Sequence, residues 1–229
     1  MIDIREISKS YGSKKIIGNW KYTFENGKIY GLIGRNGIGK TTILKCICGL
    51  TEPDSIEICT DSGDVSSSDY LTRNIYYVSD EPIYYNDLTL YEHLWIVCNV
   101  EGYSKADAKA KIKELVDTFK MEEYLHYFPA SLSKGTLQRM MLMLAFLRRS
   151  NNILLDEPFN GLDPIQLEQC LDYCRRHKQD KCIIISSHDI ESLEAVCDLL
   201  LIFTKDGIVA TNENIDRAQV KEMLGDSYE

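Results

Sequence analysis

The stretch that decides the fold reads GRNGIGKT at residues 34–41. It follows the apolar segment 29–33 and leads into a segment from about residue 40 that has helical character and stops at Gly49. A glycine-rich turn between a strand and a helix presents free backbone N–H groups at the helix N-terminus, where they can bind phosphate. Lys40 can neutralise phosphate oxygens, and the Thr41 hydroxyl can ligate Mg²⁺. This spacing therefore predicts a nucleotide phosphate loop.

The segments around this loop predict an α/β fold. Short apolar runs recur at 74–78, 152–156, 182–186 and 199–203, with helical stretches between them. Such alternation is typical of a largely parallel sheet. Upstream of the loop, the aromatic residues at 20, 22 and 24 alternate with polar residues and run into Asn26-Gly27. We expect an N-terminal antiparallel β subdomain here, in which Asn26-Gly27 joins two strands as a hairpin turn.

The middle of the chain has a different pattern, which predicts an inserted helical subdomain. Thr89 and Glu92 have the spacing of a capping box, and Ser104 opens a segment rich in Lys and Ala. Asp163-Pro164 is a further helix start. We expect one domain, with a nucleotide-binding core at 1–82 and 151–211, the helical subdomain at 83–150, and a polar tail at 212–229.

Composition excludes several classes of protein. The chain carries 26 Lys and Arg against 35 Asp and Glu, a formal net charge of −9, which argues against a nucleic-acid ligand. Its 44% hydrophobic residues are enough for a packed core. The opening residues are charged where a secretory signal is apolar, so we expect reduced thiols. The longest apolar run, 140–147, is shorter than the ~20 residues of a membrane-spanning helix.

Two further motifs carry chemistry. Asp156 and Glu157 end an apolar segment, and adjacent acids at a buried strand end are costly unless a cation or water uses them. We interpret Asp156 as acting on Mg²⁺ and Glu157 as the general base for an attacking water. His188 follows the apolar run 182–186, so it should reach a γ-phosphate from the same sheet edge.

In this order, the motifs resemble the nucleotide-binding subunit of an ATP-binding cassette (ABC) transporter along nearly the whole chain. Segment 34–41 resembles Walker A, 152–157 Walker B, LSKGT at 132–136 the signature loop, and 161–163 the D-loop. The resemblance implies ATP and Mg²⁺ as cofactors. It implies catalytic roles for Glu157, His188 and Lys40; nucleotide contacts from Tyr11, Gly34, Asn36, Gly37, Gly39, Lys40, Thr41, Thr42, Ser133, Gly135 and Asp163; and Mg²⁺ contacts from Thr41, Asp156 and Asp80.

The resemblance also implies partners. Two ATPase chains, identical or different, would pair head to tail, so that Ser133 and Gly135 act on the ATP of the other chain and Asp163 links the two sites. A separate transmembrane permease would hold the pair at the cytoplasmic face of the membrane. Lys134 in the signature loop resembles that of ABC-2 type exporters, which implies ATP-driven export.

One departure from the family and two alternatives stay open. Asp80 stands where the family usually has a glutamine that touches Mg²⁺ and relays to the permease, and a carboxylate lacks the amide's donor. The tyrosines near Asp80 could mark the permease interface.

The first alternative is a soluble ABC-type ATPase that acts on ribosomes or DNA, which the acidic balance disfavours. The second is a regulatory nucleotide-binding subunit without turnover, which the presence of Glu157 disfavours.

Overall fold

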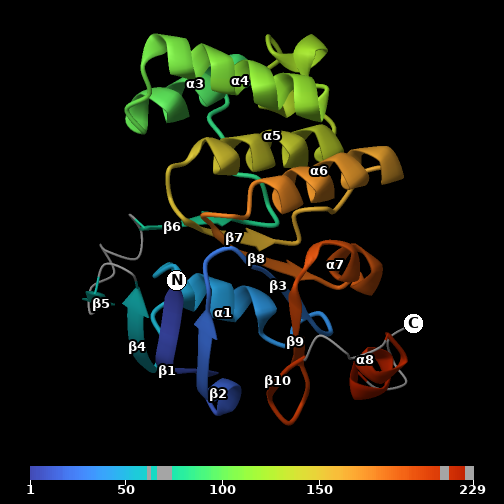
Figure 1. Ribbon diagram of the computed structural model, residues 1–229. Helices are drawn as coiled ribbons and strands as arrows, with labels where there is room; N and C mark the ends of the chain where they lie inside the picture. The colour runs from blue at the N-terminus through green and yellow to red at the C-terminus, as the bar shows by residue number, and fades with distance from the viewer. Residues whose placement is uncertain (61–62, 66–73, 212–216, 225–229) are drawn as a thin grey trace.

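The computed structural model describes residues 1–60, 63–65, 74–211 and 217–224 (Figure 1). Its larger sheet has the strand order β10-β9-β3-β8-β7-β6, and all neighbours pair in parallel except β9 and β10. This confirms the predicted α/β fold with a mainly parallel sheet. The strands are β3 (Ile29–Ile33), β6 (Ile75–Val78), β7 (Asn152–Asp156), β8 (Cys182–Ser187), β9 (Leu199–Phe203) and β10 (Ile208–Ala210).

The smaller sheet is antiparallel, as predicted, and has the order β2-β1-β4-β5. Its strands are β1 (Ile2–Tyr11), β2 (Lys14–Phe24), β4 (Ser55–Thr60) and β5 (Gly63–Val65).

The predicted hairpin at Asn26-Gly27 is wrong. β2 instead pairs with β1, which precedes it, and the chain then passes through Asn26-Gly27 into β3 of the larger sheet. All five residues of β3 are buried, and β3 pairs with β8 and β9, so neither of its edges is available to β2. The N–H of Gly27 donates to the carbonyl of Lys181, which ties the turn to the larger sheet.

The predicted helical segment contains three long helices, and the predicted caps are confirmed. The Thr89 side chain accepts from the N–H of Glu92 in a complete capping box, Ser104 accepts from the N–H of Asp107, and Asp163 accepts from the N–H of Gln166. The helices are α1 (Lys40–Ile47), α3 (Leu90–Val100), α4 (Lys105–Phe119), α5 (Lys134–Leu147), α6 (Pro164–Arg176), α7 (Ile190–Val196) and α8 (Arg217–Leu224), with the short 3₁₀ turns η1 (Glu122–Tyr124) and η2 (Pro129–Ser131).

Helix α8 lies in the expected C-terminal tail, whereas 212–216 and 225–229 of that tail lie outside the described residues. Among the helices that the structure describes, none combines the length and apolar character needed to cross a bilayer.

The larger sheet is a central layer between two cores. Because side chains alternate along a strand, Ile153 and Leu155 pack with helices α3–α7, while Leu154 packs on the side of α1 and the antiparallel sheet. Residues of β3 and β8 alternate in the same way. Figure 1 shows α1 and the antiparallel sheet on one side of this layer and α5 and α6 on the other. Burial on both faces explains the continuous apolar runs of these strands.

The central layer should therefore dominate stability. Leu154 is fully buried, whereas Leu50 is 61% exposed. We expect Leu154→Ala to lower the free energy of unfolding by about 2–5 kcal/mol, because it leaves a cavity between the larger sheet and the layer of α1 and the antiparallel sheet. Leu50→Ala, the same chemical change at the surface, should cost less than about 0.5 kcal/mol. Urea unfolding followed by circular dichroism measures both, and equal losses would contradict this account of the core.

Candidate functional site

Three strand ends meet at one edge of the larger sheet. The parallel register aligns Ile33 of β3 with Ser187 of β8, and Ser186 with Asp156 of β7. The phosphate loop, Glu157 and His188 follow directly after these strands, so the sheet brings together residues that lie far apart in sequence. This edge, at the carboxyl ends of parallel strands, is where open α/β sheets bind ligands.

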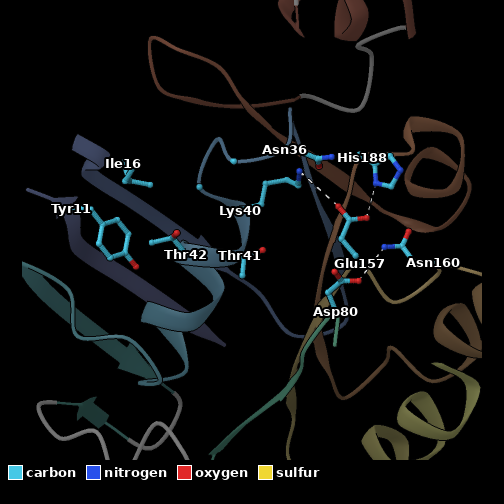
Figure 2. A pocket seen from close by; sticks show the side chains of 12 residues that line it. Tyr11, Ile16, Asn36, Lys40, Thr41, Thr42, Asp80, Glu157, Asn160 and His188 are labelled. Carbon is cyan, nitrogen blue, oxygen red and sulfur yellow. Dashed lines mark hydrogen bonds and ion pairs between the residues drawn. The ribbon is translucent and has the colours of Figure 1, made fainter. Parts of the chain in front are cut away.

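A pocket of about 450 Å³ opens at this edge, and it collects most of the predicted site residues. Figure 2 shows Tyr11 and Ile16 toward one end, Lys40 between, and Asp80, Glu157, Asn160 and His188 toward the other. All of its lining residues except Ile16 and Asn160 were predicted from the sequence. The lining consists of Tyr11, Ile16, Asn36, Gly37, Gly39, Lys40, Thr41, Thr42, Asp80, Glu157, Asn160 and His188.

The phosphate loop has a conformation that requires glycine. Gly39, the N-cap of α1, has φ 125°, and a Cβ at this position would lie 2.8 Å from Cγ2 of Ile16. A glycine cap supplies no side chain to the N–H groups of the first helical turn. These N–H groups and the positive end of the helix dipole are suited to an anion.

Lys40 is held inside this loop. Its ammonium donates to the Gly34 carbonyl at 2.7 Å and lies 3.8 Å from Oε1 of Glu157, with only 6% of the side chain exposed. Burial lowers the pKa of Lys40, while the negative charges of Glu157 and Asp156 act in the opposite direction. Gly34 does not belong to the pocket lining, and its carbonyl oxygen instead positions Lys40.

Asp156 lies beneath the pocket and is almost completely buried. Its carboxylate accepts hydrogen bonds from Oγ1 of Thr41 at 3.1 Å, from the hydroxyl of Tyr77 at 2.9 Å, and from the hydroxyl of Ser186. Burial and the charge of Asp156 raise the pKa of Tyr77, so this tyrosine stays protonated as a donor. The sequence analysis missed Tyr77 and Ser186 as partners of this carboxylate.

The donor set at Asp156 and Thr41 fits Mg²⁺. A carboxylate and a hydroxyl oxygen in contact are hard oxygen ligands, and Mg²⁺ beside a nucleotide uses one or two carboxylates together with phosphate oxygens. Asp80 lies farther along the pocket wall, where it accepts a hydrogen bond from the Asn160 amide at 3.2 Å. Its role as a Mg²⁺ ligand stays a prediction.

Glu157 has an unusual backbone conformation, with φ 48°. A residue other than glycine in this region costs on the order of 1 kcal/mol, so neighbouring contacts must hold it there. Its N–H donates to the carbonyl of Ser186 at 3.1 Å, and the Gln138 amide donates to its carbonyl at 3.2 Å. The turn aims the carboxylate into the pocket, where Oε2 lies 2.9 Å from Nδ1 of His188 (Figure 2).

Besides Gly34, three predicted nucleotide residues do not line this pocket in the part of the chain that the structure describes. Ser133 and Asp163 cap helices α5 and α6. Gly135 packs so closely against residue 161 that a Cβ would lie 2.4 Å from the Gly161 carbonyl oxygen. The segments 132–136 and 161–163 are therefore in contact with each other, outside the pocket of their own chain.

The Tyr77–Asp156 contact can be tested directly. Tyr77→Phe removes one donor from a buried carboxylate, so we expect a loss of about 1.5–3 kcal/mol in unfolding free energy. Tyr76→Phe on the same strand is the matched control, because the Tyr76 ring, which lies under the Arg148 guanidinium, is kept. Chemical denaturation of both variants measures the difference. Equal stability of the two variants would show that Tyr77 does not support Asp156.

Comparisons with known proteins agree with this geometry. The family model described as ABC transporter matches residues 17–160. The ABC-type transporter ATP-binding protein EcsA of Bacillus subtilis is 33% identical over 88% of this chain and 83% of its own. The lantibiotic transport ATP-binding protein SrtF of Streptococcus pyogenes is 28% identical over 98% of this chain and 96% of its own.

Among solved structures, the dimeric bacterial ABC transporter cassette MJ0796 has a TM-score of 0.83 at 21% identity, over 94% of this chain and all of its own. That likeness supports the fold. The matched family model covers more than half of the chain, from within β2 to beyond the paired acids at 156 and 157. The chain therefore belongs to the ABC transporter family, as an ATP-binding protein of that family.

Proposed function

We propose that this chain binds and hydrolyses ATP as a subunit of an ABC transporter and drives export through a separate transmembrane permease. The observation that carries the proposal is the pocket in which Lys40, Glu157 and His188 meet at the carboxyl ends of β3, β7 and β8. A phosphate-loop site with a positioned base and a positioned cation supports hydrolysis rather than binding alone.

The shape of the pocket suggests how ATP would lie. The phosphates would bind the N–H groups at the start of α1 together with Lys40, with Asn36, Gly37 and Thr42 along the wall. The adenine would then stack at the other end, where Tyr11 is 53% exposed beside Ile16. Thr41 and Asp156 would hold Mg²⁺, which when bound neutralises charge on the phosphate oxygens.

The residues around Glu157 support a role as general base. As a water oxygen bonds to the γ-phosphorus, the bond from that phosphorus to the β,γ-bridging oxygen would break and ADP would leave, while the proton of the water would pass to the Glu157 carboxylate. His188 would hold that carboxylate through Nδ1 at 2.9 Å, and its half-exposed ring could contact the γ-phosphate. Lys40 lies 3.8 Å from the same carboxylate and would move to the phosphates when the nucleotide binds.

A second ATPase chain would complete the site. Ser133, Gly135 and Asp163 lie outside the pocket of their own chain, and a head-to-tail dimer would place Ser133 and Gly135 against the ATP of the partner. The dimeric structure of MJ0796 supports the pairing of two such chains. Within each chain, residues 1–82 and 151–211 would form the nucleotide-binding core. Residues 83–150 would form the inserted helical subdomain that carries the signature loop, and residues 212–229 would form the tail.

Exposed apolar side chains support docking to a membrane partner. Ile83 is 78% exposed, Tyr85 69% and Val100 69%, and all three belong to the segment 83–150. Exposed apolar and aromatic residues of this kind are typical of protein interfaces. A permease bound here would place the chain at the cytoplasmic face of the membrane. The resemblance at Lys134 supports export as the direction, and the transport role named for SrtF supports a transport function.

Removal of the general base should stop turnover. We expect Glu157→Gln to lower the rate of ATP hydrolysis by about 10²- to 10⁴-fold, because the amide cannot accept the proton. ATP binding should persist, and size-exclusion chromatography with ATP should show more dimer. Glu194→Gln, on the exposed face of α7, is the control and should leave turnover unchanged. Near-normal phosphate release by Glu157→Gln would refute the assignment, and no release by the unaltered chain would favour the regulatory alternative.

The transporter assignment needs a separate test. A tagged chain should co-purify with a polytopic membrane protein from detergent-solubilised membranes of its own cells, as identified by mass spectrometry. Ile83→Asp combined with Tyr85→Asp should weaken this association without loss of folding, because both side chains are exposed. Recovery with ribosomes or DNA would instead support the soluble alternative.

A further inference from the structure

A second pocket lies at the opposite edge of the same sheet. It has a volume of about 440 Å³, and its lining includes Asn151 and Lys181, the residues just before β7 and β8. The nucleotide pocket instead uses Glu157 and His188, which follow these strands. A strand rises about 3.3 Å per residue, so the two pockets are separated by roughly 20 Å along β7. Residues at the C-terminal ends of α5 and α6 also line the second pocket, and Figure 1 shows both helices on the same side of the sheet.

Positively charged residues dominate this pocket, although the whole chain carries a net charge of −9. Two of them are already neutralised. The Lys111 ammonium lies 2.9 Å from a carboxylate oxygen of Glu114, and Arg148 lies 3.0 Å from Glu101. The remaining cations in the lining are Arg149, Arg176 and Lys181, whereas Asp180 is the one acid there among the described residues.

These three cations make no ion pair with any residue that the structure describes. The Arg149 guanidinium lies 4.5 Å from the centre of the Tyr103 ring. Arg176 donates from Nε to the Asp172 carbonyl at 3.3 Å, and Lys181 donates to the Ser150 carbonyl at 2.9 Å. Within the described residues, the outer N–H groups of both guanidiniums therefore keep their capacity to donate to a ligand.

The helix ends explain part of this arrangement. Cations near the C-termini of α5 and α6 interact favourably with the helix dipoles, so their location alone does not define a site. Lys181 is different, because it lies in the loop before β8. Burial lowers the pKa of Lys181, and the charge of Lys111 lowers it further, although Asp180 and Glu101 oppose this. The charged form of Lys181 is thus disfavoured mainly by burial beside the cavity, and a bound anion would stabilise it.

We propose that this second pocket binds a small phosphate-bearing molecule at a site separate from the nucleotide. Arginine forks bind phosphate through paired hydrogen bonds, and a lysine adds a point charge. The rings of Tyr103, Phe146 and Tyr173 also line the pocket, and its volume is that of a ligand site rather than of a lone ion. The shared chemistry is the phosphate group, carried either by free phosphate or by an organic ester.

The histidines provide a test that separates the two pockets. The chain has four histidines. His177 lines the second pocket and stacks on Tyr173 with ring centroids 3.9 Å apart, His188 lines the nucleotide pocket, and His93 and His126 line neither. Inorganic phosphate can be titrated into the full chain at fixed pH and ionic strength while the Cε1–H proton resonances are recorded. We expect a saturable shift of His177 with a Kd of about 1 mM, and a different midpoint for His188.

Matched variants make this test specific. Arg149→Glu combined with Arg176→Glu should raise the phosphate concentration at the midpoint of the His177 shift by at least about tenfold, since each substitution removes a charge-assisted hydrogen bond. Lys21→Glu combined with Lys109→Glu changes the net charge equally at exposed positions outside the pocket and should keep the wild-type midpoint. Circular dichroism checks that both variants fold.

The outcomes are distinct. Tighter binding of phenyl phosphate than of inorganic phosphate would identify an organic ester as the ligand class, and the reverse order would identify free phosphate. The proposal is overturned if His177 shows no saturable shift, if sodium chloride produces the same shift, or if the arginine variants respond like the wild type. None of these results depends on ATP hydrolysis.

Discussion

The buried carboxylate of Asp156 is the interaction on which the site depends. A carboxylate that is 1% exposed is stable only when donors replace the water it has lost. Its donors come from three elements: Thr41 from α1, Tyr77 from β6 and Ser186 from β8. Each bond fixes one element relative to the end of β7. The group suited to Mg²⁺ therefore also holds the phosphate loop against the sheet, so stability and function share the same contacts.

The backbone after Asp156 separates the tasks of two adjacent acids. In a regular strand, the side chains of Asp156 and Glu157 would point to opposite faces of the sheet, and neither carboxylate would reach the pocket beyond the strand end. The positive φ of Glu157 turns its carboxylate toward Lys40 and His188, while Asp156 stays under the loop. Contacts to the backbone of Glu157 from Ser186 and Gln138 offset the cost of this turn. Local strain thus occurs where the chemistry requires it.

Local signals in the sequence predicted five strands of the larger sheet and the caps at Thr89, Ser104 and Asp163, because each depends on a few neighbouring residues. Local signals also predicted Lys40, Thr41, Glu157 and His188 of the pocket, and the resemblance to the family supplied Tyr11, Asn36, Thr42 and Asp80. Signals that depend on distant partners failed. Asn26-Gly27 has the composition of a hairpin turn, yet β3 pairs with strands more than 150 residues later in the chain. The bonds from Tyr77 to Asp156 and from Asn160 to Asp80 have no sequence pattern, because sheet order alone brings these residues together.

The two edges of the larger sheet offer anions different physical environments. At the carboxyl edge, α1 begins with free N–H groups and a positive dipole end, so glycines suffice and leave a recognisable motif. At the opposite edge, α5 and α6 end, and their dipoles present negative charge. An anion can bind there only if side-chain cations outweigh that charge, and this is the role that we assign to Arg149, Arg176 and Lys181 of the lining. Because such a site consists of scattered side chains, it leaves no motif, and only the folded chain reveals it.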